Sequence, residues 1–239
     1  MTTTLGRTRE RHDVVPSTMD LAAAAARAGA PDGHVVLARR QTAGRGRAGR
    51  AWHSADDGGL YLSVVLRGFD GPAAAGGLTL AAGLGVAEAV RWLGAADVRL
   101  KWPNDVLLGE RKVAGILTDW VGDGAAVVGV GLNVAQASFP GELAGTATSV
   151  ALAAGAAPEP AAALEVLLET LDAAVARFRE NGLAWVVPEW TARSGLWGRR
   201  GRAAGVAGVL RRLDPDGALV LEQDDGTERR LTAGALDLL

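Results

Sequence analysis

The stretch GRGRAGRAW, residues 44–52, decides which fold the chain can adopt. Its glycines follow the spacing Gly44-x-Gly46-x-x-Gly49, which matches the dinucleotide-binding fingerprint of a doubly wound sheet. That fingerprint must open an apolar helix directly after its third glycine. Here a mostly polar segment follows, and then a strand-like run at 60–66, so the sequence leaves no room for the helix. A Walker A loop is excluded too, because neither Lys-Ser nor Lys-Thr follows Gly49.

The composition of this loop favours an anionic ligand. Arginine carries fixed, permanently charged donors that suit phosphate and carboxylate groups. Glycine lets the backbone approach a ligand closely. A solvated basic loop is the simpler alternative, but Trp52 argues against it because an indole gives a ring of the ligand a face to stack on.

The totals narrow the class of protein. The 239 residues are 49% hydrophobic and 22% charged, which suits one large domain and a small one. The formal net charge of −2 does not fit a dedicated nucleic-acid binder. The absence of cysteine excludes disulfides and thiolate sites and agrees with a cytoplasmic location. No signal peptide and no membrane span of roughly twenty apolar residues is expected.

Hydrophobic periodicity predicts helices alternating with short strands. The predicted helices cover 18–28, 71–94, 158–181 and 183–193. The predicted strands cover 34–40, 60–66, 97–101, 104–108, 112–121 and 125–134, with a long loop at 41–58. Close-set strands at 203–213, 217–222 and 227–232 predict a small β-barrel. We therefore expect a catalytic body over 1–193 and a C-terminal domain over 194–239.

Three further motifs carry polar groups where strands are expected. The string KWPND, Lys101–Asp105, holds one of the two lysines of the chain and favours a cleft, although a strand bulge with a packed Trp is the alternative. Lys112 opens an apolar strand that contains Gly115, and it could equally be an exposed lysine at a strand end. Gly129 and Gly131 lie in the strand predicted at 125–134, and Asn133 comes shortly after them. Glycines inside a strand indicate close approach of a ligand.

Together these motifs resemble the biotin protein ligase family. The matching strings are Ser17-Thr18, Gln41 with the loop up to Trp52, Lys101–Asp105, Arg111–Leu117 and Gly129–Val134, in the order and spacing of the family. The match covers most of 12–134 and continues more loosely through Gly201–Leu236. The resemblance implies an α+β fold, with a mixed β-sheet flanked by helices in a class II synthetase-like catalytic domain and a small SH3-like barrel behind it.

The resemblance also implies a reaction and its residues. The family joins biotin and ATP into biotinyl-5′-AMP and then transfers biotin to a lysine of a carrier domain. The implied biotin-binding residues are Ser17, Thr18, Gln41, Gly115, Gly131 and Lys112. The implied ATP-binding residues are Arg45, Arg47, Arg50, Trp52, Asn104 and Asn133, with Trp52 as the adenine partner. The implied catalytic residues are Arg47, Lys112 and Asp105, and Asp105 is also a candidate ligand for Mg²⁺.

The expected substrates are biotin and ATP with Mg²⁺, without a tightly bound cofactor, and the expected partner is the biotin carboxyl carrier domain of a carboxylase. Too few residues precede Ser17 for a DNA-binding domain, so neither a DNA partner nor repressor activity is expected. A homodimer is possible, and no membrane partner is expected. A lipoate–protein ligase and a non-catalytic binder of phosphate or nucleic acid are the alternatives.

Overall fold

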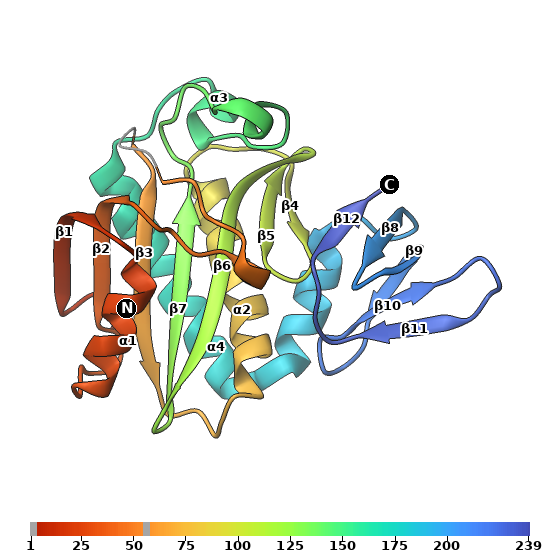
Figure 1. Cartoon of the computed structure of the whole chain (residues 1–239), viewed down its shortest axis with the longest axis horizontal. Helices are drawn as coiled ribbons and strands as arrows, with labels where there is room; N and C mark the ends of the chain where they lie inside the picture. The colour runs from red at the N-terminus through yellow and green to blue at the C-terminus, as the bar shows by residue number, and fades with distance from the viewer. Residues whose placement is uncertain (1–3, 55–57) are drawn as a thin grey trace.

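The protein is described as a computed structural model that covers residues 4–54 and 58–239. Within these residues a large mixed sheet carries helices on both faces, and a smaller antiparallel sheet lies at one side (Figure 1). The α+β architecture implied by the resemblance is therefore confirmed.

The large sheet has the strand order β1-β2-β3-β7-β6-β5-β4. Its β1 and β2 are parallel, and every other neighbouring pair is antiparallel. In chain order its strands are β1 (Arg9–Val15), β2 (Val35–Gln41), β3 (Leu60–Arg67), β4 (Val98–Lys101), β5 (Asp105–Leu108), β6 (Arg111–Gly122) and β7 (Ala125–Leu132). The sequence did not predict β1, because its run of charged residues at an exposed edge lacks the alternation of a half-buried strand.

Helices cover the two faces unequally. The helix α1 (Thr18–Arg27) packs on one face, where Ser17 caps it by accepting a hydrogen bond from the Met19 N–H at 3.3 Å. The helices α2 (Ala74–Trp92) and α4 (Pro160–Ser194) pack on the other face and on each other. A short helix, α3 (Val150–Ala154), follows Ser149 and was not predicted.

Two glycines set the geometry of the helix pair. A Cβ at Gly83 of α2 would lie 2.6 Å from the ring of Trp190, so the missing side chain lets this buried indole pack against the helix. In α4 the helical course breaks at Gly182, where φ is +57°. The two helices predicted over 158–181 and 183–193 are thus confirmed as the two halves of α4.

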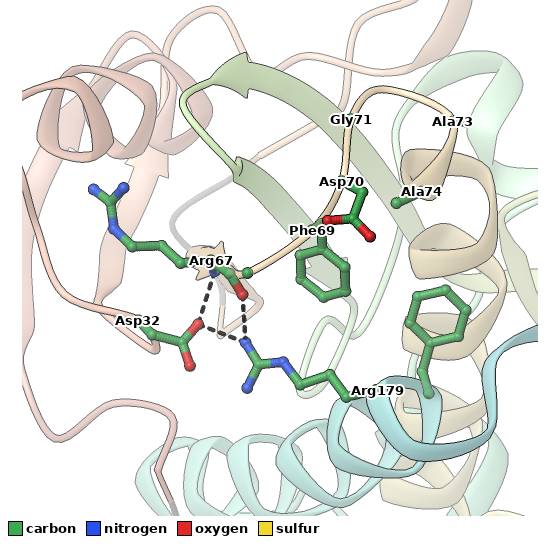
Figure 2. A pocket seen from close by; sticks show the side chains of 10 residues that line it. Asp32, Arg67, Phe69, Asp70, Gly71, Ala73, Ala74 and Arg179 are labelled. Carbon is green, nitrogen blue, oxygen red and sulfur yellow. Dashed lines mark hydrogen bonds and ion pairs between the residues drawn. The ribbon is translucent and has the colours of Figure 1, made fainter.

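An ionic network fastens α4 to the end of β3. Arg179 pairs with Asp32 at 2.7 Å, and the Arg67 N–H donates to the same carboxylate at 2.8 Å (Figure 2). The Arg67 guanidinium also donates to the backbone carbonyls of Ala30 and Ala26. These contacts line a hollow of about 740 Å³, at the opposite end of β3 from Leu60. Asp32, Arg67 and Arg179 all have partners within the protein, which fits a structural role for these three residues.

The C-terminal segment forms a five-stranded antiparallel sheet of order β11-β10-β9-β8-β12. Its strands are β8 (Arg200–Ala203), β9 (Val206–Leu213), β10 (Leu219–Glu222), β11 (Glu228–Leu231) and β12 (Leu236–Leu238). The strand predicted over 203–213 corresponds to β9, which begins later than predicted because Ala204 and Gly205 form a turn with φ of +48° and +80°. The strand β8 before this turn was not predicted. The strand β12 was not predicted.

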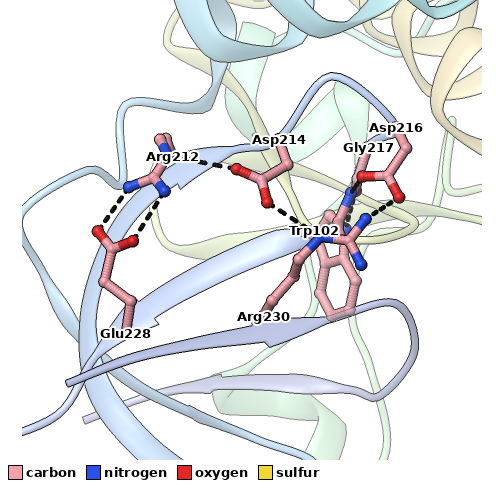
Figure 3. A network of polar contacts seen from close by, with 8 residues as sticks. Trp102, Arg212, Asp214, Asp216, Gly217, Glu228 and Arg230 are labelled. Atoms are coloured by element: carbon pink, nitrogen blue, oxygen red, sulfur yellow. Dashed lines mark hydrogen bonds and ion pairs between the residues drawn. The ribbon is translucent and has the colours of Figure 1, made fainter.

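One tight turn joins this sheet to the body. The indole N–H of Trp102 donates to the Gly217 carbonyl at 3.0 Å, and both partners are buried (Figure 3). Arg230 pairs with Asp214 at 3.0 Å and also with Asp216, which holds the turn in shape. Buried residues of both parts belong to one hydrophobic cluster. The division at 193/194 therefore stays a prediction.

Among the helices of the described residues, none combines the length and apolar character that crossing a membrane requires.

Candidate active site

The arginine-rich loop folds as a small closed hairpin in front of the large sheet (Figure 1). Arg45 and Ala51 form an antiparallel bridge, and the Trp52 N–H donates to the Gly44 carbonyl at 2.8 Å. The tip is a single 3₁₀ turn over Arg47–Gly49. The loop thus projects the tip from a closed base on the α1 side of the sheet. Residues 55–57 of the predicted loop lie outside the described residues.

Two glycines form a flat floor for the site. Gly115 of β6 and Gly131 of β7 are register partners, and the indole of Trp52 lies directly on both. A Cβ at Gly115 would come within 2.8 Å of this ring, and one at Gly131 would collide with it. The group that lies on these glycines is the protein's own Trp52, and the close approach of a ligand stays a prediction. The Trp52 indole thus packs on Gly115 and Gly131, which the resemblance assigns to biotin binding. Stacking of this indole on adenine stays a prediction.

The two lysines of the chain meet one carboxylate. Lys112 Nζ lies 2.6 Å from Asp105 Oδ1, and Lys101 Nζ lies 3.4 Å from Oδ2. Asp105 is only 8% exposed and is the register partner of Gly115. The Lys112 ammonium also lies 5.3 Å from the centre of the Trp52 ring. The motif KWPND and Lys112 therefore come together beside the glycine floor, carrying a net positive charge.

Asn104 fixes the backbone of this motif. Its side-chain Nδ2 donates to the Ile116 carbonyl at 2.9 Å, and its own carbonyl accepts from the Ile116 N–H at 2.9 Å. The buried amide therefore aligns the end of β5 with β6. This contact positions Asp105, and binding of phosphate by Asn104 stays a prediction.

Arg47 extends the positive charge. Burial lowers the pKa of its guanidinium, while the nearby Asp105 carboxylate raises it. Arginine stays charged in any case because its ordinary pKa is so high. The guanidinium at the tip of the loop is therefore near enough to Asp105 for the two charges to interact.

A separate polar group lies where α1 begins. The Thr18 N–H donates to Gln41 Oε1 at 2.8 Å, and the Thr18 hydroxyl lies 2.8 Å from that of Ser63. Gln41 is anchored in turn, because its N–H donates to the Ser54 hydroxyl at 2.9 Å. Ser63 is fully buried opposite Gly129 and was missed by the sequence analysis. A single serine inside the apolar run of β3 was the available signal.

Asn133 directly follows β7 and lies in a buried polar layer. Its Nδ2 donates to the Thr148 carbonyl at 3.0 Å. Gln136, which the sequence analysis also missed, donates to the Tyr61 hydroxyl at 3.3 Å. These bonds fix the chain just beyond the glycine floor. A role of Asn133 in binding ATP stays a prediction.

The remaining arginines of the loop lie differently. Arg45 pairs with two other carboxylates, at distances of 2.9 Å to both Asp20 and Asp119. Arg50 is exposed at the end of the loop tip. The assignment of both residues to ATP stays a prediction.

The described residues do not fit a protein-held Mg²⁺ site. Within 4–54 and 58–239, no group of three or more His, Asp or Glu side chains could hold a metal ion. Asp105 has a lysine at each oxygen. A protein that binds Mg²⁺ with few carboxylates needs substrate phosphates to complete the coordination. The geometry gives no support to Asp105 as a metal ligand.

Comparisons with known proteins agree with this arrangement. The sequence model of the Biotin/lipoate A/B protein ligase family matches residues 12–134. A biotin--[acetyl-CoA-carboxylase] ligase of Mycobacterium tuberculosis is 41% identical over 223 residues, which cover 88% of this chain and 82% of the relative. The bifunctional ligase/repressor BirA of Escherichia coli is 38% identical over 200 residues, which cover 80% of this chain but only 62% of that protein. The biotin protein ligase of Aquifex aeolicus, solved with biotin and ATP, superposes with a TM-score of 0.85 at 28% identity and covers 98% of this chain and 99% of its own.

Proposed function

The chain belongs to the biotin/lipoate A/B protein ligase family, and we propose that it activates biotin with ATP and transfers it to a lysine of a biotin carboxyl carrier domain. The main supporting observation is that Lys112 and Asp105 form an ion pair beside a glycine floor covered by Trp52, with the Arg47 charge acting on the same carboxylate. Cations beside an apolar aromatic and glycine surface suit an apolar ring system that bears a carboxylate. The relatives named above support biotin as that acid.

In the first step, a carboxylate oxygen of biotin attacks the α-phosphorus of ATP. A new O–P bond forms, the bond to the β-phosphate oxygen breaks, and pyrophosphate leaves with the electron pair. Two anions meet in this step, so fixed positive charge lowers the barrier. Lys112 and Arg47 supply that charge, and Asp105 orients the Lys112 ammonium. Mg²⁺ bound to the phosphates of ATP would neutralise part of their charge.

In the second step, the neutral amine of an acceptor lysine attacks the acyl carbon of the adenylate. A C–N bond forms, the bond from carbon to the phosphate oxygen breaks, AMP leaves, and the amine loses a proton. The adenylate is a mixed anhydride, so water must be kept from it until the acceptor arrives. The hairpin over residues 44–52 lies where such a cover is needed.

The test is a transfer assay with the purified chain, biotin, ATP, Mg²⁺ and an isolated carrier domain. We expect one added biotin on one lysine of the carrier domain, detected by mass spectrometry. ATP–pyrophosphate exchange with biotin or lipoate separates this proposal from a lipoate ligase. Lack of exchange with either acid, together with salt-sensitive binding of nucleic acid, would favour a non-catalytic binder instead.

A further inference from the structure

Arg45 stands apart from the other cations of the loop because carboxylates already hold both ends of its guanidinium. One nitrogen donates to Asp20 in the first turn of α1, and the other donates to Asp119 on β6, each at 2.9 Å. The Arg45 side chain is 43% exposed and that of Asp119 is 34% exposed, so the contacts lie at the rim of the site. A phosphate at this position would face two carboxylates.

Arg45 lies at the base of the hairpin, so its two ion pairs restrict movement of that base. Arg45 and Ala51 pair across the base, and the Gly46 N–H donates to the Arg50 carbonyl at 2.7 Å. The tip with Arg47 therefore moves only if the base moves. On the inner side the base rests on the sheet through Trp52. On the outer side Arg45 ties it to two separate elements, α1 and β6.

From this geometry we infer that Arg45 is a positioning residue, a latch that keeps the loop of residues 44–52 closed by bridging Asp20 and Asp119. The inference rests on the proposed function for the ligand that the loop retains, biotinyl-5′-AMP. In this role Arg45 holds the cover in place, and Arg47 supplies charge to the phosphate beneath it.

The first test measures the latch in the free protein. Hydrogen exchange of the Gly46 and Trp52 amides reports opening of the hairpin, because both amides are bonded inside it. Exposed ion pairs contribute little each, so Asp119→Asn should speed this exchange roughly two- to fivefold and Arg45→Ala about tenfold. Adding salt should speed exchange in the wild type but not in Arg45→Ala. Arg200→Ala, which breaks an exposed pair with Asp224 in the C-terminal sheet, is the matched control.

The second test measures release of the adenylate. Preformed biotinyl-5′-AMP should leave Arg45→Ala and Asp119→Asn faster by the same factors. In Asp119→Asn the rate of adenylate formation and the KM for ATP should stay within about twofold of wild type. The swap of Arg45→Glu with Asp119→Arg should restore part of the retention. The two tests together separate the latch from the alternative that Arg45 binds phosphate.

The two possible roles of Arg45, phosphate binding and closing the loop, predict opposite effects of removing the Asp119 carboxylate. If Arg45 binds ATP, Arg45→Ala raises the KM for ATP, whereas Asp119→Asn frees the guanidinium and improves binding. That pattern, or wild-type exchange in Asp119→Asn, would overturn the latch. If the wild type forms no adenylate at all, the proposed function fails, and the exchange of the Gly46 and Trp52 amides alone still decides whether Arg45 is a latch.

Discussion

At the scale of residues, the buried Asp105 and the two partly exposed lysines form a charge cluster whose members depend on one another. Removing one partner of such a cluster leaves the other charges poorly compensated. Lys112 also lies beside the glycine floor, since a Cβ at Gly115 would be 3.0 Å from its Nζ. It is therefore the lysine placed to meet a ligand carboxylate.

We expect Lys112→Gln to slow formation of biotinyl-5′-AMP by roughly 100-fold or more, the scale of losing one preorganised charge-stabilising donor. Single-turnover formation of the adenylate measures this effect. Arg111→Gln removes one positive charge from the adjacent, exposed position and is the control. Equal losses in the two variants would show that net charge alone matters.

A second residue-scale prediction concerns the glycine floor. Gly131→Ala places a methyl group against the Trp52 ring, and overpacking of this kind costs about 1–3 kcal/mol. We expect biotin to bind roughly 5- to 100-fold more weakly, as measured by calorimetry. Gly76→Ala is the matched control, because a Cβ there meets nothing within 4 Å and should leave biotin affinity unchanged.

The sequence singled out residue types that are scarce in this chain or energetically unfavourable in a strand. Lysines are scarce in this chain, and a charged motif beside a proline in a strand is unusual, so Lys112 and Asp105 could be found. The hydroxyl of Ser63 could not be assigned because its partner, the Thr18 hydroxyl, lies on α1, far from Ser63 in the sequence. The two carboxylates that meet Arg45 are likewise far from it in sequence.

At the scale of elements, the turn of the C-terminal sheet is held by the indole of Trp102, which lies inside the motif KWPND. Trp102→Phe removes the donor and leaves the buried Gly217 carbonyl unpaired, which should cost about 1–3 kcal/mol of unfolding free energy. Urea unfolding checks this value. Trp92→Phe is the control, because the Trp92 indole is exposed and its hydrogen bond to Glu88 lies at the surface, so the change there should stay within about 0.5 kcal/mol.

The elements with strong periodicity or clear capping were predictable, and those shaped by tertiary contacts were not. Helix α1 has its Ser17 cap and an alanine run, so its bounds could be predicted closely. Strand β1 is held to the sheet by pairing with β2 and by the ion pair of Arg9 with Glu165 on α4. Neither contact has a local signal, because both partners lie far along the chain.

At the scale of the whole molecule, ion pairs connect elements that are distant in sequence and make the stability depend on pH. The hydrogen bond from Arg9 lowers the pKa of Glu165, and the one from Arg199 lowers the pKa of Glu110, each from an ordinary value of 4.5. The first pair ties β1 to α4, and the second ties Glu110, next to β6, to Arg199 before β8. A carboxyl group with a lowered pKa in the folded state stabilises the fold above its unfolded pKa, and that contribution is lost as the pH falls through the folded pKa.

We therefore expect the melting temperature to fall progressively as the pH drops below about 4.5, where the paired carboxylates begin to take up protons. Glu165→Gln should lower the melting temperature at pH 7 and flatten its decline on acidification, because that carboxyl no longer contributes to the linkage. Glu180→Gln, on the exposed end of the first half of α4, should keep the wild-type slope. Since the Glu165 side chain is 60% exposed, salt should screen its pair and reduce the difference between Glu165→Gln and wild type. A slope in Glu165→Gln identical to that of the wild type at low salt would show that the pair between β1 and α4 contributes nothing to the acid sensitivity of the fold.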